Sequence, residues 1–437
     1  MIGLDRRTVL AAVAGVAAWP AAARAPRLRV NARSEEGGRQ LRILARALPE
    51  LRRTGAWARQ VALHADMTHQ QHGSWRFLPW HRAQLVWFER MVSAAAGEPF
   101  NLPYWDWTTA QPLPDELFDL PELTIRGLAV GGADRRIRKG QGVPGSYRAR
   151  FEGSLGDEPA RFLGGPMTQT PAGPAYHMGS AEQHGHAWMH AFAGGDMTLA
   201  ETAPNDPAFW LHHANVDRIW ASWSRQWSAA SEGRIAYPEA WLSLPIGGFE
   251  DEGGARVADA RSADFLDPGA LVGAYAPYSY AYDRLLPPGA RFAARERGAV
   301  VEAQSFSLTM RGSDGVFSIP RDLAAFRRRA EAAGRSLELA AELEVVVLAQ
   351  PNRRRCLTFD APSAEAEPVV TVFPMRHAHP TLCRTDASRA VEAALGDGRP
   401  LRLRSFDPFD PARGPLQILS ARITGRIEAR DRERIGG

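Results

Sequence analysis

The sequence predicts an α-helical bundle followed by a β-rich, sandwich-like domain. In the first half of the 437-residue chain, apolar residues such as Leu41, Leu44 and Leu48 recur at helical spacing. From about residue 290, short β-prone runs alternate with turn residues, which is typical of a sandwich. Ten of the 12 histidines lie between His64 and His213, so the helical part also holds the side chains that most often bind transition metals.

Three parts are expected along the chain: an export signal at residues 1–25, a helical domain at 26–270 and a β-rich C-terminal domain at 271–437. The signal is indicated by Arg6-Arg7, an apolar Ala/Val-rich run and small residues that end at Ala25. The paired arginines resemble a twin-arginine signal, and an ordinary secretory signal is the alternative. Either one predicts a periplasmic or secreted bacterial protein.

Four main helices are expected in the first half. They cover residues 40–64 (with a second amphipathic run from Trp57), 80–95, 182–193 and 207–223. The last of them begins at Asp206-Pro207, a capping acid followed by proline, and the third ends at Gly194-Gly195. These helices are the parts of a bundle that carries a site in its core. Residues 110–175 are rich in Gly and Pro and are expected to form loops.

Short β-prone runs dominate the second half. They cover residues 300–303, 337–348, 369–373, 401–403 and 418–427, and a helix is expected at 321–333. Cys356 and Cys383 lie among these runs and could form a disulfide in an oxidising compartment.

The overall composition argues against two classes of partner. The net charge is only +4, and the basic residues are mixed with acids, so a nucleic-acid partner is not expected. After the N-terminus no stretch has 18 consecutive apolar residues, so no membrane span is expected.

One group of histidines lies on two neighbouring helices. His186 and His190 are four residues apart on an expected helix, which places both imidazoles on one face, where they can share an ion. A third ligand would come from His212 or His213. Neighbours on a helix point about 100° apart, so we expect one of the two to face the ion and the other to support it.

A second group precedes and opens another helix. His81 sits at the expected helix start, and His72 and His64 come before it. Three imidazoles per ion suit copper and leave an open position for an exogenous ligand. No carboxylates are interleaved as in a di-iron bundle. The two groups together predict two metal ions, whereas a mononuclear zinc protein would leave one group idle.

Two long motifs resemble a known family. HGSWRFLPWHRAQLVWFE at residues 72–89 resembles the copper A signature of tyrosinases, catechol oxidases and molluscan haemocyanins. DPAFWLHHANVDR at 206–218 resembles their copper B signature. LPYWDW at 102–107 and GGDM at 194–197 are similar to other landmarks of the family. The resemblance covers roughly residues 35–230.

The resemblance implies a type 3 pair of copper ions that binds dioxygen as co-substrate. The implied ligands are His64, His72 and His81 for one ion and His186, His190 and His213 for the other, with His212 as the supporting neighbour. It implies a copper oxidase that converts o-diphenols, or o-aminophenols, to o-quinones. A haemocyanin-like dioxygen-binding protein is the alternative. A small phenolic substrate and a copper chaperone are the expected partners, and the oligomeric state is open.

Two positions depart from the family pattern. His64 is separated from His72 by only seven residues, so His69 is a rival for the first copper ligand. Glu182, four residues before His186, matches the catalytic acid that holds a water in phenol hydroxylators. The residue after His186 is usually Asn in those enzymes, but it is Ala187 here. The position after His190 is also alanine. Weak monophenol hydroxylation is therefore expected.

Other residues have plainer interpretations. His177 and His184 are expected in loops or supporting positions, and His377 and His379 in a solvated turn near Pro380 rather than on one face of a metal-binding strand. Buried ion pairs are expected for Arg82, Glu89, Asp217 and Arg218, with Asp106 as a further candidate.

The C-terminal domain is expected to pack on the copper domain. Tyr278-Ser-Tyr280-Ala-Tyr282 resembles the tyrosine motif that ends the catalytic domain in relatives with such an appendage. In some relatives the appendage shields the copper site and must be cut away. Arg353-Arg354-Arg355 is a candidate cleavage site, with plain surface as the alternative.

Overall fold

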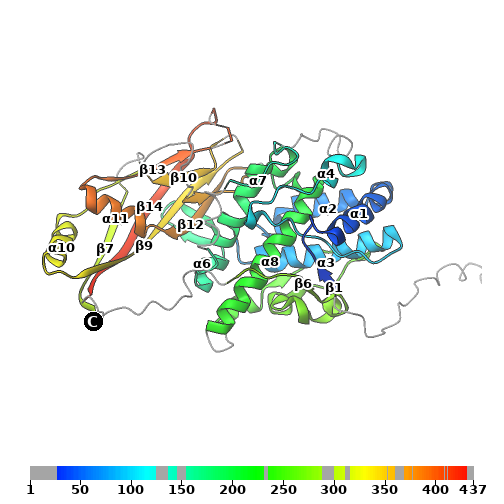
Figure 1. Ribbon diagram of the computed structural model, residues 1–437, viewed down its shortest axis with the longest axis horizontal. Helices are drawn as coiled ribbons and strands as arrows, with labels where there is room; N and C mark the ends of the chain where they lie inside the picture. The colour runs from blue at the N-terminus through cyan, green and yellow to red at the C-terminus, as the bar shows by residue number, and fades with distance from the viewer. Residues whose placement is uncertain are drawn as a thin grey trace, which may run out of the picture.

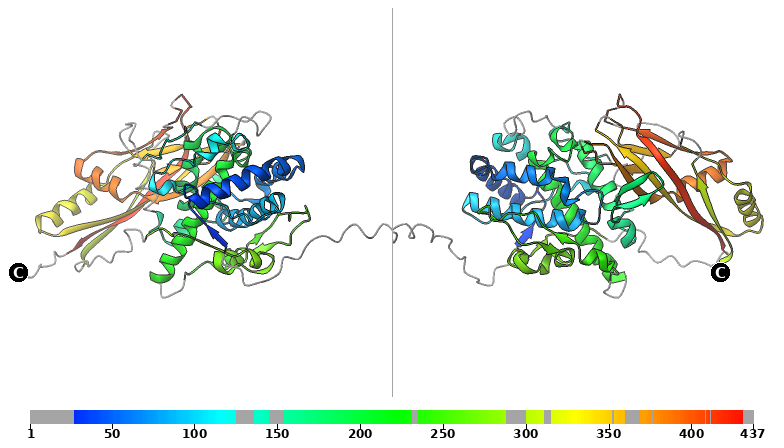
Figure 2. Two further views of the ribbon diagram at one scale, coloured as in Figure 1. Left: turned by 45° about the vertical axis from the view of Figure 1, so that its right-hand side comes forward. Right: turned by 180° about the vertical axis from the view of Figure 1, so that it is seen from behind.

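Helices gather at one end of the molecule and sheets at the other (Figures 1 and 2). The computed structural model describes residues 27–124, 136–144, 154–230, 235–287, 300–310, 315–351, 353–359, 369–375, 377–407, 409–410 and 412–430. The expected export signal therefore lies outside the described residues. None of the described helices combines the length and apolar character that crossing a membrane requires.

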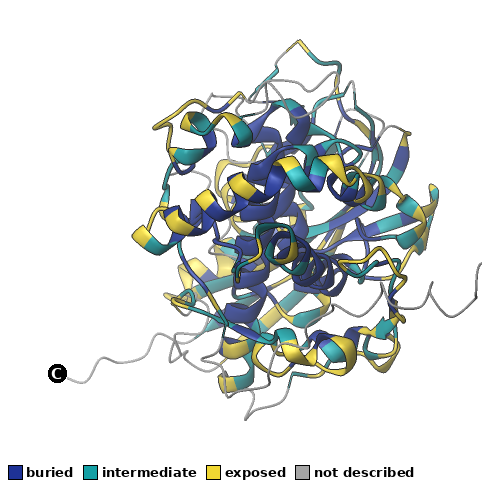
Figure 3. Ribbon diagram, turned by 90° about the vertical axis from the view of Figure 1, so that its right-hand side faces the viewer, coloured by how far each residue is buried: buried dark blue, intermediate teal, exposed yellow. Residues whose placement is uncertain are grey.

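The helical end contains the expected bundle. Its main helices are α1 (Glu35–Arg53), α2 (Ala56–Ala65), α3 (Phe77–Ala96), α7 (Trp188–Ala193) and α8 (Pro207–Ala230). The stretch expected as one helix at 40–64 is two, because Gly55 adopts a left-handed conformation with φ 72° between α1 and α2. Buried residues fill the centre of this end, and exposed residues lie around its rim (Figure 3).

The helix expected at 182–193 has two geometries. Residues Ala181–Ala187 form a π-helix, labelled η4, and α7 continues it in α geometry. π-helical turns are rare and occur most often at functional sites. Every residue of η4 and α7 is buried.

Two sheets form the other end. A six-stranded sheet has the order β2-β3-β12-β9-β14-β7, and a four-stranded sheet the order β11-β10-β13-β8. Their bounds are β2 (Thr168–Thr170), β3 (Gly173–Met178), β7 (Val300–Thr309), β8 (Val316–Phe317), β9 (Ser336–Ala349), β10 (Cys356–Phe359), β11 (Val370–Thr371), β12 (His379–Asp386), β13 (Leu401–Phe406) and β14 (Gln417–Arg430). Both sheets contribute to one hydrophobic cluster, as a sandwich-like domain requires. The expected helix is α10 (Arg321–Ala332), and a further helix, α11 (Ser388–Asp397), was not expected.

The six-stranded sheet crosses the expected boundary between the domains. Strand β3 belongs by sequence to the helical part, yet it pairs in parallel with β12, with Tyr176 opposite Thr381 and Met178 opposite Cys383. The hairpin of β2 and β3 also lies within the stretch expected to form loops. The two regions are therefore joined by backbone hydrogen bonds as well as by side-chain packing.

Two expectations for the C-terminal residues need correction. Arg355 is 3% exposed, and Arg354 donates to the carbonyls of Arg413 and Ser405, so this arginine run is not an open loop suited to cleavage. The cysteines lie in different sheets and do not form a disulfide.

Glu89, Asp217, Arg82 and Arg218 form buried ion pairs, as expected, and β1 (Arg27–Arg29) joins them through Arg29. β1 pairs with β6 (Tyr280–Tyr282), the tyrosine motif. Arg29 binds both Glu89 and Asp217, and Arg82 also binds Asp217. Arg218 pairs with Asp106 at 3.1 Å.

Candidate metal centre

Three histidines from α2, α3 and the loop between them converge in the core. The Nε2 atom of His64 lies 3.0 Å from Nε2 of His72 and 3.3 Å from Nε2 of His81. All three side chains are at most 3% exposed. Nitrogens that meet this closely in a dry core offer lone pairs to a shared cation.

A second group comes from η4, α7 and α8. The ligand atoms of His186, His190, His212 and His213 all lie within 4.8 Å of one another. The sequence argument allowed only one of the adjacent pair His212 and His213 to face this group, but the structure places a nitrogen of both within it. The helix geometry therefore does not choose between them.

The two groups are neighbours. The rings of His81 and His213 stack at 4.2 Å between centroids with 12° between their planes. The ring of His72 lies 5.3 Å from that of His186. The ligand atoms of His213 also come within 4.8 Å of those of His64 and His81. The histidines thus form one buried cluster with two halves.

Backbone carbonyls fix the orientation of three rings. Nδ1 of His64 donates to the carbonyl of Ala200 (2.6 Å), that of His81 to Phe77 (2.7 Å) and that of His190 to Met197 (2.7 Å). A proton on Nδ1 leaves Nε2 as the lone-pair nitrogen, which is the arrangement that metal-binding histidines share.

The imidazoles of the cluster are better suited to binding a metal ion than to binding protons. Burial lowers the pKa of every imidazole, to about 3 for His72 and His212 and well below the usual value for the others, namely His64, His81, His186, His190 and His213. Within the described part of the chain, Nε2 of His190 and both ring nitrogens of His186, His212 and His213 lack a hydrogen-bond partner. Buried polar atoms are rarely left so, and bound cations satisfy them.

Comparison with known proteins identifies the family. The family model for the common central domain of tyrosinase matches residues 54–170 and 167–226. A tyrosinase of Streptomyces antibioticus is 31% identical over a match that covers 41% of this chain and 77% of that protein. The chain belongs to the tyrosinase family. Proteins of this family bind a dicopper centre, and this chain contains a buried cluster of histidines.

Other relatives match a smaller share of their length. A tyrosinase of a Hahella strain is 34% identical, and the match covers 36% of this chain but only 38% of that protein.

Among solved structures, latent apple tyrosinase superimposes with a TM-score of 0.61 at 17% identity, covering 94% of this chain and 97% of that one. A functional unit of octopus hemocyanin gives 0.55 at 15% identity, covering 92% and 99%. These structures share the fold, including its β-rich C-terminal region.

The remaining histidines lie apart from the cluster or beside it. His69, the rival of His64, is partly exposed, stacks on Trp80 and lies 3.6 Å from Asp66. His177 is buried in β3, and His184 in η4. His377 is exposed, but His379 is buried in β12, where Nδ1 contacts Thr381 Oγ1 at 2.9 Å. The expectation of a solvated turn is therefore wrong for His379.

Glu182 supports a histidine directly. Both of its carboxylate oxygens accept from the Gly73 backbone N–H at 2.9 Å, and Oε1 lies 3.3 Å from Nδ1 of His72. It does for His72 what carbonyls do for His64, His81 and His190. Burial raises the pKa of Glu182 to about 8, although the Gly73 hydrogen bond opposes the shift.

Phe373 is the site residue that sequence reasoning missed. It follows β11 in the C-terminal region, and its ring centroid lies 4.3 Å from that of His190, 5.0 Å from His186 and 5.3 Å from His72. In the sequence it is one apolar residue of a β-prone run. Nothing in that run indicates a contact with histidines that lie far earlier in the chain.

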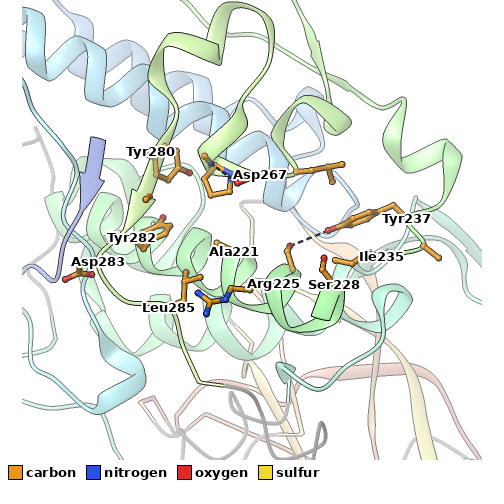
Figure 4. A pocket seen from close by; sticks show the side chains of 16 residues that line it. Ala221, Arg225, Ser228, Ile235, Tyr237, Asp267, Tyr280, Tyr282, Asp283 and Leu285 are labelled. Carbon is orange, nitrogen blue, oxygen red and sulfur yellow. Dashed lines mark hydrogen bonds between the residues drawn. The ribbon is translucent and has the colours of Figure 1, made fainter. Parts of the chain in front are cut away.

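A large pocket of about 1010 Å³ lies elsewhere, along the C-terminal half of α8 (Figure 4). Ser224 and Arg225 of α8, Tyr237 and Asp267 are among its lining residues. None of the clustered histidines lines it. This pocket is therefore separate from the candidate metal centre.

Proposed function

We propose that the chain is a type 3 copper oxidase that converts o-diphenols or o-aminophenols to o-quinones with dioxygen. The observation that carries the proposal is the buried cluster of neutral imidazoles in two adjacent halves. The proposed ligands are His64, His72 and His81 for one ion and His186, His190 and His213 for the other. When bound, two copper ions would take electrons from the phenol and deliver them to dioxygen.

The chain's own residues prepare this chemistry. Burial keeps the imidazoles unprotonated, so they are ready to bind a cation at neutral pH. Each hydrogen bond that Nδ1 donates fixes a ring and raises the basicity of its Nε2. Glu182, besides orienting His72, is the proposed catalytic acid–base group, because it is the one carboxylate within hydrogen-bond reach of a clustered histidine among the described residues.

His213 is proposed as the ligand and His212 as its support. His213 lies closest to the first half, stacked on His81, and takes part in both halves of the cluster. His212 lies 5.9 Å from Trp107 on the far side of the second half. The contact with His81 therefore favours His213 as the ligand of the second ion.

The protein is proposed to be latent while Phe373 lies beside the histidine cluster. The Phe373 ring covers His72, His186 and His190, so a phenol ring cannot approach the same imidazoles until Phe373 moves. The apple structure that shares this fold is itself described as latent. We therefore propose that the C-terminal region shields the site.

Oxygen uptake by the copper-loaded full chain tests the proposal. Catechol and 2-aminophenol should be consumed with quinone-type products, and tyrosol much more slowly, before and after a mild detergent treatment that loosens the shield. Metal analysis should find two copper ions per chain. Reversible dioxygen binding without oxidation of any phenol, in either state, would instead support a haemocyanin-like carrier.

The proposal also includes export of the chain. Residues 1–25 are proposed to direct the chain to the periplasm or outside the cell, with a copper chaperone as a possible partner. N-terminal sequencing of protein from the culture medium and periplasm tests the cleavage.

A further inference from the structure

The backbone of one short segment, residues 197–200, accepts a hydrogen bond from one histidine of each half of the cluster. The carbonyl of Met197 accepts from Nδ1 of His190, and the carbonyl of Ala200, three residues later, accepts from Nδ1 of His64. His81 differs, because its carbonyl partner, Phe77, belongs to its own helix. The segment 197–200 is thus the one described stretch whose backbone orients imidazoles of both halves through hydrogen bonds.

Two different cores anchor this segment. The Met197 side chain is fully buried in the core of the helical part. Ala200 is fully buried in the core of the C-terminal sheets. Because only Thr198 and Leu199 separate its two carbonyls, and the residues at both ends are buried, a displacement of the segment moves His64 and His190 together.

Thr202 closes the turn that contains the segment. Its hydroxyl donates to the carbonyl of Asp196 at 2.7 Å, and its N–H donates to the carbonyl of Leu199 at 3.2 Å. The hydroxyl bond thus spans the stretch from 196 to 202 and draws its two ends together. Among the described residues the hydroxyl of Thr202 bonds to backbone carbonyls and to no histidine, so it acts through the backbone.

We infer that Thr202 is a positioning residue that couples the two copper sites, by fixing the carbonyls that orient His64 and His190. This inference rests on the proposed function. It goes further because it makes the orientation of a ligand histidine in each site depend on one hydroxyl outside the histidine cluster. Losing that hydroxyl should loosen the two sites in parallel rather than one of them alone.

Copper titration of the metal-free full-length protein tests the inference. Thr202→Val removes the hydroxyl but keeps the shape, and Thr202→Ser restores it. We expect Thr202→Val to weaken both copper sites by roughly 10-fold, the lower end of the effect of outer partners on metal affinity. Thr202→Ser should bind both ions as the wild type does. Thr170→Val is the matched control, because it removes a hydroxyl-to-carbonyl bond of the same 2.7 Å length, to Gly173.

A second measurement separates positioning from general destabilisation. In metal-free protein with labelled histidines, the Nδ1–H protons of His64 and His190 should exchange faster in Thr202→Val, while that of His81 stays unchanged. Weakening of one copper site only, or equal changes at all three histidines, would overturn the inference. If the wild type itself fails to bind two copper ions, the proposed function fails instead, and the exchange experiment still decides the positioning role.

Discussion

The ring of Phe373 lies 4.3 Å from the ring of His190, with 32° between their planes. One residue belongs to the C-terminal region and the other to α7 in the helical part. Phe373 also approaches His72, so a single apolar side chain touches both halves of the cluster. An aromatic ring at this position excludes water and, on the proposed function, would stand in the way of a phenol.

Shortening this side chain should open the site. Phe373→Ala is expected to raise kcat/KM for catechol by at least about 10-fold, provided that the lost barrier is near 1.4 kcal/mol or more. The matched control is Phe409→Ala. Phe409 also packs on the helical part, 5.3 Å from Trp188, but contacts no clustered histidine in the described chain. Steady-state oxygen uptake at equal copper content is the measurement. An unchanged rate in Phe373→Ala, with two copper ions bound, would contradict the shield.

Replacing each of the adjacent histidines should have unequal effects. His213→Ala is expected to abolish binding of the second copper ion, because it removes a proposed ligand. His212→Ala should weaken that ion by roughly 10–100-fold, as typical supporting residues do. Equilibrium dialysis followed by metal analysis distinguishes the two. Since the structure places both imidazoles in the cluster, the opposite order would assign His212 as the ligand.

Diphenols should be oxidised much faster than monophenols. A monophenol must lose its proton on entry, and no amide at position 187 helps Glu182 to hold a water for that step. Ala187→Asn should raise the ratio of tyrosol to catechol rates. Because Ala187 is buried in the core of the C-terminal sheets, the larger side chain should also lower stability by about 1–3 kcal/mol. Ala187→Ser is the smaller control. Wild-type hydroxylation of tyrosol at the catechol rate would refute this argument.

Removing the C-terminal region should destabilise the helical part. A chain that ends at residue 287 leaves the β3 edge without β12 and uncovers Met178, Ala187 and Ala200. We expect aggregation or a much lower Tm. A chain cut at a protease sequence inserted after Pro287, by contrast, should stay associated in gel filtration. Release of a stable, active helical fragment would show that the region serves only as a removable shield.

Acid should weaken the packing of α3 on α8. Burial alone would raise the pKa of Asp217, but the guanidinium groups of Arg82 and Arg29 outweigh it and lower that pKa below its usual value. The resulting stabilisation is complete above the unfolded pKa, about 3.9, and is lost as pH falls through the lower folded value. Asp217→Asn should cost about 3–5 kcal/mol at neutral pH, and its Tm should fall less than the wild-type Tm below pH 4. Parallel Tm curves for the two proteins would contradict this assignment.

Much of the helical part could be predicted, because its signals are local. Apolar spacing located α3, and the Asp206-Pro207 start located α8. The i, i+4 spacing brought His186 and His190 into one group although His186 lies in the π-helical η4. The break at Gly55 was missed, since a single glycine inside an amphipathic run does not show which backbone conformation it takes.

Long-range pairings could not be predicted from one sequence. The β3 strand is short and lies in a Gly/Pro-rich stretch, and its pairing with β12 joins residues far apart in the sequence. Phe373 and Ala200 are likewise unremarkable in sequence, because their roles depend on which distant histidine they meet. The adjacent pair His212 and His213 remained open for the same reason: helix geometry gives their angle but not the position of the cluster.

The parallel pairing of Tyr176 with Thr381 has a consequence for biosynthesis. A ribosome must add about 200 more residues after β3 before its partner strand exists, so the pairing is a late, high-contact-order event. Until then β3 presents an open edge to other nascent chains. The clustered histidines are all synthesised early, whereas the C-terminal region that packs over them is synthesised last. Any cellular factor that delivers metal therefore has a window between translation of α8 and docking of β12.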